Sequence, residues 1–146
     1  MPPVDSQPIT ADSLRLRAEW QNRFPSATVV WEETADEGQG IDFDGLDPSA
    51  MVKALFATWS HWSEVLYWYR SNLELHGWQG RQVKPGTWWE WTSAERPGER
   101  IDLLDRGVWR QLPGWPVPEE RVGQLGFEVY FTARGAFSET LSAAIA

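Results

Sequence analysis

The spacing of apolar residues over residues 60–78 predicts the helix around which the chain is organised. Five apolar residues recur at helical spacing and form one face: Trp62, Val65, Leu66, Tyr69 and Leu73. Trp68 and Leu75 widen this face. Ser60 is expected to cap the start of the helix, and Gly77 to end it, because glycine tolerates the left-handed backbone of a C-terminal cap. A helix with so wide an apolar face is expected to pack on a sheet.

Short helices are predicted at both ends of the chain. Leu16, Trp20 and Phe24 are four residues apart, which predicts a helix from Thr10 to about Arg23 that ends before Pro25. An apolar spacing near the C-terminus predicts a second short helix, with the residues Phe137, Leu141 and Ile145. Residues 1–9 contain three prolines and no periodicity, so we expect a flexible arm. Residues 10–146 are expected to form a single domain.

Strands are predicted on both sides of the central helix, over residues 28–33, 87–92, 100–104 and 126–132. In the last of these, Phe127, Val129 and Phe131 alternate with polar residues. Residues 50–58 fit either a helix or a strand, and we favour a strand. The strands follow one another at hairpin spacing, which predicts an α+β fold. We expect the central helix to pack on a mainly antiparallel sheet, with short N- and C-terminal helices.

Composition limits the class of protein. The chain has 146 residues, of which 42% are hydrophobic, and no apolar run is long enough to span a membrane. The first ten residues lack the basic and apolar regions of a signal peptide, so a cytoplasmic location is expected. There is no cysteine, which excludes disulfides and thiolate metal sites. The net charge of -8 argues against binding to nucleic acid.

Acidic residues are concentrated in one stretch. Seven carboxylates and no Lys or Arg lie between Pro25 and Val52, and this stretch carries nearly all of the net charge. We expect a surface that attracts a basic protein partner, formed by Asp36, Glu37, Asp42 and Asp44. Two alternatives are a solvated turn and a calcium loop. The calcium alternative is weak, because the glycine comes at the fourth position and Lys53 stands at the twelfth.

The 11 tryptophans are the other unusual feature of the sequence. Trp109 and Trp115 fall in an irregular stretch that is rich in proline and glycine, where we expect them to anchor a protein partner. Alternatively, they fold back as a lid over the core. Trp88 and Glu90 share one face of a predicted strand, and together with Trp91 they form a possible stacking surface for a small molecule or carbohydrate.

Little in the sequence points to catalysis or to a metal. His61 and His76 lie 15 residues apart at the two ends of the central helix. A rise of ~1.5 Å per residue separates them by roughly 22 Å, so they cannot share one metal ion. No motif for a nucleophilic serine is present. A carboxylate-type enzyme with His61 or Glu90 as the base is the least favoured reading, and we predict no cofactor.

The central helix resembles a known sequence pattern. Glu64, Val65, Trp68, Tyr69, Arg70, Leu73, Gly77 and Trp78 match the pattern EVxxWYRxxLxxxGW. This pattern is similar to that of small, uncharacterised bacterial α+β proteins, in which a strand of the type Trp-x-Trp follows, as Trp89 and Trp91 do here. The resemblance covers about residues 55–105. It implies a helix on an antiparallel sheet and a bacterial source, and it brings no catalytic residues.

Three functions follow from these observations, in order of preference. The first is a non-catalytic docking module for a protein partner with a basic surface, such as an immunity or inhibitor protein. The second is a domain that binds a small molecule or carbohydrate on tryptophan platforms. The third is an enzyme that uses carboxylates.

Overall fold

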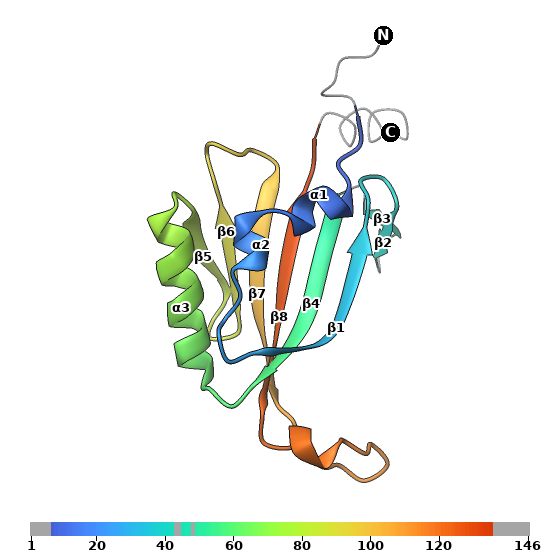
Figure 1. Ribbon diagram of the computed structural model, residues 1–146, viewed down its shortest axis with the longest axis vertical. Helices are drawn as coiled ribbons and strands as arrows, with labels where there is room; N and C mark the ends of the chain where they lie inside the picture. The colour runs from blue at the N-terminus through green and yellow to red at the C-terminus, as the bar shows by residue number, and fades with distance from the viewer. Residues whose placement is uncertain (1–6, 43–44, 48, 136–146) are drawn as a thin grey trace.

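The computed structural model describes residues 7–42, 45–47 and 49–135, and within them it contains an α+β fold dominated by one sheet (Figure 1). In chain order the elements are α1 (Ala11–Arg15), α2 (Ala18–Gln21), β1 (Thr28–Ala35), β2 (Gly40–Asp42), β3 (Gly45–Asp47), β4 (Ala50–Thr58), α3 (Trp62–Leu75), β5 (Gln79–Lys84), β6 (Trp88–Thr92), β7 (Glu99–Val108), the 3-10 helix η2 (Glu119–Arg121) and β8 (Leu125–Ala133).

Six strands form the main sheet in the order β1-β4-β8-β7-β6-β5, and every neighbouring pair is antiparallel. The chain crosses through α3 from β4 to the far edge at β5, and it returns strand by strand until β8 pairs with β4. The two strands β2 and β3 form a separate small hairpin. The predicted antiparallel α+β class is therefore confirmed.

The strands of the sheet alternate as predicted, and their inward residues form the core. In β4 the side chains of Val52, Ala54 and Phe56 are buried, and in β8 those of Phe127 and Phe131 are buried against them. Residues of opposite parity point to the other face of the sheet, because successive side chains of a strand alternate. Residues 50–58 are a strand, as favoured from the sequence.

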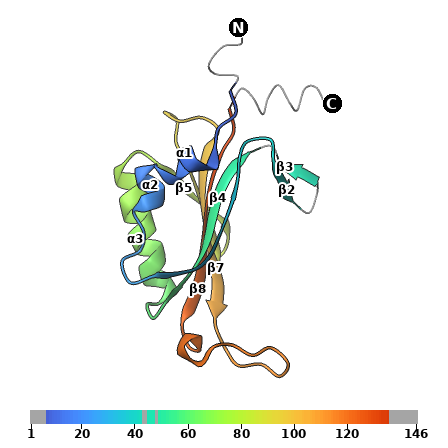
Figure 2. The same ribbon diagram turned by 45° about the vertical axis from the view of Figure 1, so that its right-hand side comes forward.

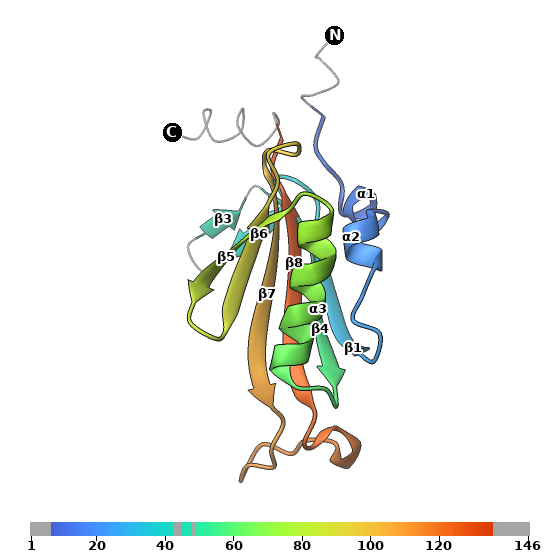
Figure 3. The same cartoon turned by 90° about the vertical axis from the view of Figure 1, so that its left-hand side faces the viewer.

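All three α-helices lie on one face of the sheet, and the β2–β3 hairpin projects on the other side (Figures 2 and 3). In α3 the buried residues are Val65, Tyr69 and Leu73, and the Tyr69 ring lies 6.1 Å from that of Phe127 on β8. Leu75 was expected to widen the apolar face of this helix, but it is exposed.

The ends of α3 differ slightly from the prediction. The helix begins after His61 rather than after Ser60, and His61 makes no side-chain cap. Its C-terminal end is as predicted: Gly77 has φ 86°, and the Trp78 amide donates to the Leu73 carbonyl at 3.1 Å. This is the hydrogen bond that a left-handed glycine cap provides.

The predicted N-terminal helix is two short helices. Thr10 caps the first as expected, accepting a hydrogen bond from the Ser13 amide at 3.2 Å. The chain is extended at Arg17, whose guanidinium pairs with Glu99 at 2.5 Å and lies 5.6 Å from the centre of the Phe131 ring. Contacts to the sheet therefore interrupt the helix, and Leu16 is exposed instead of buried.

Two predictions lie partly or wholly outside the described residues. The predicted C-terminal helix, with Phe137, Leu141 and Ile145, falls outside them. Of the predicted arm over residues 1–9, only residues 7–9 are described, and there Ile9 is tied to Glu37 by two hydrogen bonds of 2.8 Å. Strand β5 was not predicted, because its residues show no alternation of apolar and polar side chains.

Candidate functional site

The face of the sheet opposite the helices, which we call the open face, carries a row of polar side chains across all six strands. The register makes each one the cross-strand neighbour of the next: Glu33, Lys53, Tyr130, Asp102, Glu90 and Arg81. Five of these six residues are Asp, Glu, Lys or Arg, and the two signs of charge are mixed. Directly opposed side chains on one face of a sheet interact, so the row forms a connected set of contacts.

Lys53 is the centre of the first group of contacts on the open face. Its ammonium lies 5.1 Å from the centre of the Trp31 ring and 5.1 Å from that of Tyr130. It also pairs with Glu33 at 3.4 Å. A cation held between two aromatic faces is attracted by both rings, so the geometry fixes three side chains from three strands in one arrangement.

A second group surrounds the buried carboxylate of Glu128. Arg106 donates to it at 2.9 Å, and the Tyr130 hydroxyl also donates to it. Burial alone would raise the pKa of Glu128, but the two hydrogen bonds and the charges of Arg106 and Lys53 outweigh it, so this pKa lies below its usual value. Burial and the bond to Glu128 raise the pKa of the Tyr130 hydroxyl to about 12.

A third group surrounds Asp102, whose side chain is buried although it lies on the open face. The Trp88 indole N–H and the Arg100 guanidinium each donate to it at 2.8 Å. Burial raises the pKa of Asp102, while these two hydrogen bonds and the Arg100 charge act in the opposite direction. Beside it, Glu90 pairs with Arg81 at 3.1 Å and with Arg100 at 3.5 Å.

The open face ends in a hollow of about 270 Å³, lined by Leu55, Arg106, Gly107, Val108, Trp109, Gly126 and Glu128. Trp109 forms one wall. Its ring packs so closely on Gly126 that a Cβ there would lie 3.0 Å from it, and Arg121 lies 5.4 Å from the ring centre. Trp109 therefore holds the loop of residues 109–124 against the sheet.

The two buried carboxylates of the open face are held by neighbouring side chains. Glu128 and Asp102 each accept two hydrogen bonds from them. His61 and His76 are at the two ends of α3, and His76 Nδ1 contacts the Asn72 carbonyl at 2.7 Å. Within the described part of the chain no group of three His, Asp or Glu residues is placed to hold a metal ion.

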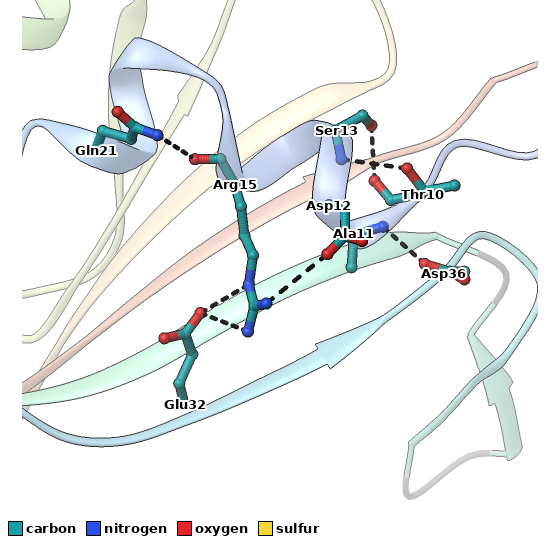
Figure 4. Close-up of polar contacts among 8 residues, drawn as sticks. All are labelled: Thr10, Ala11, Asp12, Ser13, Arg15, Gln21, Glu32 and Asp36. Atoms are coloured by element: carbon teal, nitrogen blue, oxygen red, sulfur yellow. Dashed lines mark hydrogen bonds and ion pairs between the residues drawn. The ribbon is translucent and has the colours of Figure 1, made fainter.

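Two of the four acidic residues predicted to attract a partner have structural contacts instead. Asp36 accepts a hydrogen bond from the Ala11 amide at 2.8 Å, at the start of α1 (Figure 4). Glu37 is only 2% exposed and accepts hydrogen bonds from the Ile9 and Gly135 amides, each at 2.8 Å. The prediction of an exposed docking residue is wrong for Glu37, because its carboxylate fastens two chain segments together.

The other two predicted acidic residues lie at the β2–β3 hairpin. Asp42 ends β2, but the position of its side chain, like all of Asp44, falls outside the described residues. The hairpin and the loop that carries Trp109 and Trp115 are at opposite ends of the sheet (Figure 1). The nine residues of β4 separate them, which is roughly 26 Å at ~3.3 Å per residue. The structure does not bring these two predicted features together.

Trp109 and Trp115 also differ from each other. Trp115 is 73% exposed, as a partner anchor would be, whereas Trp109 is half-buried against Gly126. Trp109 therefore fits the alternative in which the tryptophan folds back onto the protein. It packs on the open face of the sheet and not over the core.

The predicted stacking surface of Trp88, Trp91 and Glu90 does not exist as one surface. Trp88 and Glu90 lie on the open face as predicted. Trp91 points to the opposite face, which bears the helices and which we call the covered face, and it is fully buried. The Trp91 ring lies 6.1 Å from that of Trp89. The alternation rule requires this separation, because residues 90 and 91 of one strand face opposite sides.

Sequence reasoning did not identify Trp31, Lys53, Glu128 or Tyr130 as site residues. Each is a polar or amphipathic residue at an outward position of a predicted strand. That signal was present in the sequence, but the pairing of β1 with β4 and of β4 with β8 was needed to assemble them.

The hollow beside β1 on the covered side is wider, and its lining residues contact one another. It measures about 630 Å³ and is lined by Arg15, Trp20, Gln21, Arg23 and Glu32. Arg15 pairs with Glu32 at 3.1 Å, and Gln21 donates to the Arg15 carbonyl at 3.0 Å (Figure 4). These contacts link the helices to β1.

A scan of protein-family models, a search of curated proteins and a search of solved structures each found no match to this chain. None of the helices in the described part is both long and apolar enough to cross a membrane.

Proposed function

We propose that this chain is a non-catalytic docking module that binds a protein partner with a basic surface across the open face. The observation that carries the proposal is the cluster of Trp31, Lys53 and Tyr130, which is held in place on a sheet face where no helix of the described residues lies. Aromatic and Arg side chains are enriched in protein interfaces. Side chains that are already ordered lose little entropy on binding.

The proposal takes α3 and the N-terminal helices as the layer that covers the other face. The burial of Val65, Tyr69 and Leu73, together with the contact between Tyr69 and Phe127, supports this assignment. With the helices on one face, the open face is the large surface that the described residues leave for a partner.

The sign of the partner's charge follows from the distribution of carboxylates. Seven acidic residues and no basic residue lie within residues 32–47, which form part of β1 and the adjoining hairpin. A negative edge beside the open face would raise the rate at which a basic partner arrives and orient it. An immunity or inhibitor protein acting on a basic toxin is a concrete case.

Size and chemistry favour docking over the alternatives. The hollow of about 270 Å³ on the open face is smaller than the ~300–1,000 Å³ typical of small-molecule pockets. The hollow of about 630 Å³ beside β1 is large enough, but it is lined mainly by charged and polar side chains, whereas small-molecule pockets are mostly apolar. General-base catalysis by Glu128 is disfavoured, because the hydrogen bonds from Arg106 and Tyr130 lower its pKa and make the carboxylate a weaker base. A binding role requires no free base.

The experiment is affinity capture from the source cell with matched variants. The wild-type chain, Trp31→Ala, Lys53→Ala and Tyr67→Ala are each immobilised, Tyr67 being an exposed residue on the opposite, helical side. We expect a basic protein that the wild type and Tyr67→Ala retain and that both open-face variants lose. Melting temperatures confirm that the variants are folded. Equal retention by all four proteins, or loss with Tyr67→Ala alone, would contradict the proposal.

A further inference from the structure

Strand β1 is an edge of the sheet that contains no Lys, Arg or Pro. It pairs with β4 on one side only, and no other described strand pairs with it. In the described part of the chain, no backbone hydrogen bond outside the β1–β4 ladder involves residues 28–35. Alternate N–H and C=O groups of an edge strand point outward, so β1 offers a row of unused donors and acceptors over eight residues.

The opposite edge, β5, is protected. It is six residues long, it contains Arg81 and Lys84, and Pro85 follows it directly. Its register with β6 shifts between Gln82 and Lys84. Basic residues, proline and irregular pairing are the means by which edge strands avoid pairing with other chains. Strand β1 also has one register shift, next to Val30, but it contains no Lys, Arg or Pro.

The side chains of β1 suit a partner strand. Val29 is 43% exposed on the covered side and Trp31 is 38% exposed on the open side, so apolar surface is available on both faces of the edge. Glu32 and Glu33 follow them and pair with Arg15 and Lys53, while residues 36–47 add five more carboxylates and no basic residue. A strand placed beside β1 would therefore meet exposed apolar groups and a negative potential.

We propose that an extended, positively charged segment of a protein partner adds to the free edge of β1 as a further strand of the sheet. This inference rests on the proposed function and names the way in which the partner is recognised. Backbone hydrogen bonds to β1 would supply affinity, and alternate Lys or Arg side chains would supply specificity. A second copy of this chain is a poorer occupant, because its own β1 would bring Glu32 and Glu33 against like charges.

The test begins with peptides selected against the full chain. A library of random 12-residue peptides displayed on phage is selected on the immobilised protein at low salt. The best synthetic peptide is then added to isotope-labelled protein, and amide hydrogen exchange is followed by NMR. We expect peptides with a net positive charge and no central proline. Their binding should slow exchange by at least tenfold at alternate amides of residues 28–35 and leave β5 unchanged.

Two kinds of variant separate backbone pairing from charge. A peptide with alternate amides N-methylated keeps its charge but cannot form a ladder, and we expect it to bind at least tenfold more weakly. Thr34 is an exposed residue of β1. Thr34→Lys should weaken binding severalfold, while Thr34→Gln and the β5 variant Gln82→Lys should leave it unchanged.

Several results would overturn the inference. They are a selection that yields no binder, binders that are acidic, protection on β5 or on the open face instead of β1, and binding that survives N-methylation. Dimerisation of the free protein with protection of residues 28–35, measured by analytical ultracentrifugation, would assign the edge to a second copy instead. The proposed function is tested separately, and it fails if Lys53→Ala still retains the captured protein. If the partner binds the open face alone, Lys53→Ala loses it but Thr34→Lys binds it as the wild type does, which contradicts only the pairing with β1.

Discussion

The carboxylate of Glu37 joins the N-terminal segment to the end of β8, because it accepts one hydrogen bond from the Ile9 amide and one from the Gly135 amide. Asp36, its neighbour, accepts a hydrogen bond from the first residue of α1. In contrast, Glu33 is exposed and pairs with the side chain of Lys53. Acidic residues that are close together in the sequence therefore differ greatly in what they contribute to the folded state.

Removal of the Glu37 carboxylate should destabilise the protein. Glu37→Ala leaves two backbone amides without their acceptor, and we expect the free energy of unfolding to fall by about 1–3 kcal/mol. Glu33→Ala is the matched control, and its effect should stay within about 0.5 kcal/mol because its ion pair is exposed. Urea denaturation measures both values. Equal losses for the two variants would show that burial does not distinguish these carboxylates.

The pH dependence of stability should report on Glu128. Its pKa is lowered in the folded protein, so the ionised form stabilises the fold. That contribution is complete above the ordinary value of 4.5 and is lost as the pH falls through the lower pKa of the folded state. We therefore expect Glu128→Gln to cost about 1–2 kcal/mol near pH 7 and progressively less below about pH 4.5.

The measurement is urea denaturation of the wild type and Glu128→Gln at a series of pH values. Glu95→Gln, at an exposed turn residue, serves as the control and should follow the wild type throughout. A gap between the wild type and Glu128→Gln that widens on acidification would mean that the hydrogen bonds from Arg106 and Tyr130 do not favour the ionised form.

At the scale of secondary structure, the sequence predicted the elements whose burial pattern is local. The apolar alternation of β4 and β8 and the glycine cap after α3 can be read from adjacent residues, and they were correct. The break between α1 and α2 could not be predicted from adjacent residues, because it depends on contacts of Arg17 with Glu99 and Phe131, which are distant in the sequence. Strand β5 was missed because an exposed edge strand has no apolar face to reveal it.

The loop of residues 109–124 yields a prediction about two tryptophans that sequence alone treated as equivalent. Trp109 packs on Gly126, so we expect Trp109→Ala to lower the free energy of unfolding by about 1–3 kcal/mol. Trp115 is exposed, and Trp115→Ala should change it by less than about 0.5 kcal/mol. Chemical denaturation tests both. A larger loss for Trp115→Ala would mean that the loop is held to the sheet by its tip and not by Trp109.

At the scale of the whole molecule, pairing between distant strands decides where the candidate site forms. Trp31, Lys53 and Tyr130 come from β1, β4 and β8, and only the register of the sheet brings them together. Sequence reasoning placed Trp88 and Glu90 on the correct face because both lie on one strand. It could not predict that the acidic hairpin and the Trp115 loop lie at opposite ends of the sheet, because spacing along the sequence does not show which end of the sheet a loop occupies.

The remaining acidic residues should act on the partner through long-range attraction. Asp42, Asp44 and Asp47 are the carboxylates to neutralise, because Asp36 and Glu37 accept hydrogen bonds from backbone amides, Glu32 pairs with Arg15 and Glu33 pairs with Lys53. Replacing the three with Asn should slow association with the captured partner severalfold at low salt and flatten its salt dependence, while dissociation changes little. Stopped-flow mixing at several salt concentrations measures both rate constants.

The control is Glu119→Gln with Glu120→Gln, two exposed charges at the opposite end of the sheet, which should leave association nearly unchanged. If both sets of substitutions slow association equally, the net charge of the molecule matters and the acidic edge beside β1 has no special role.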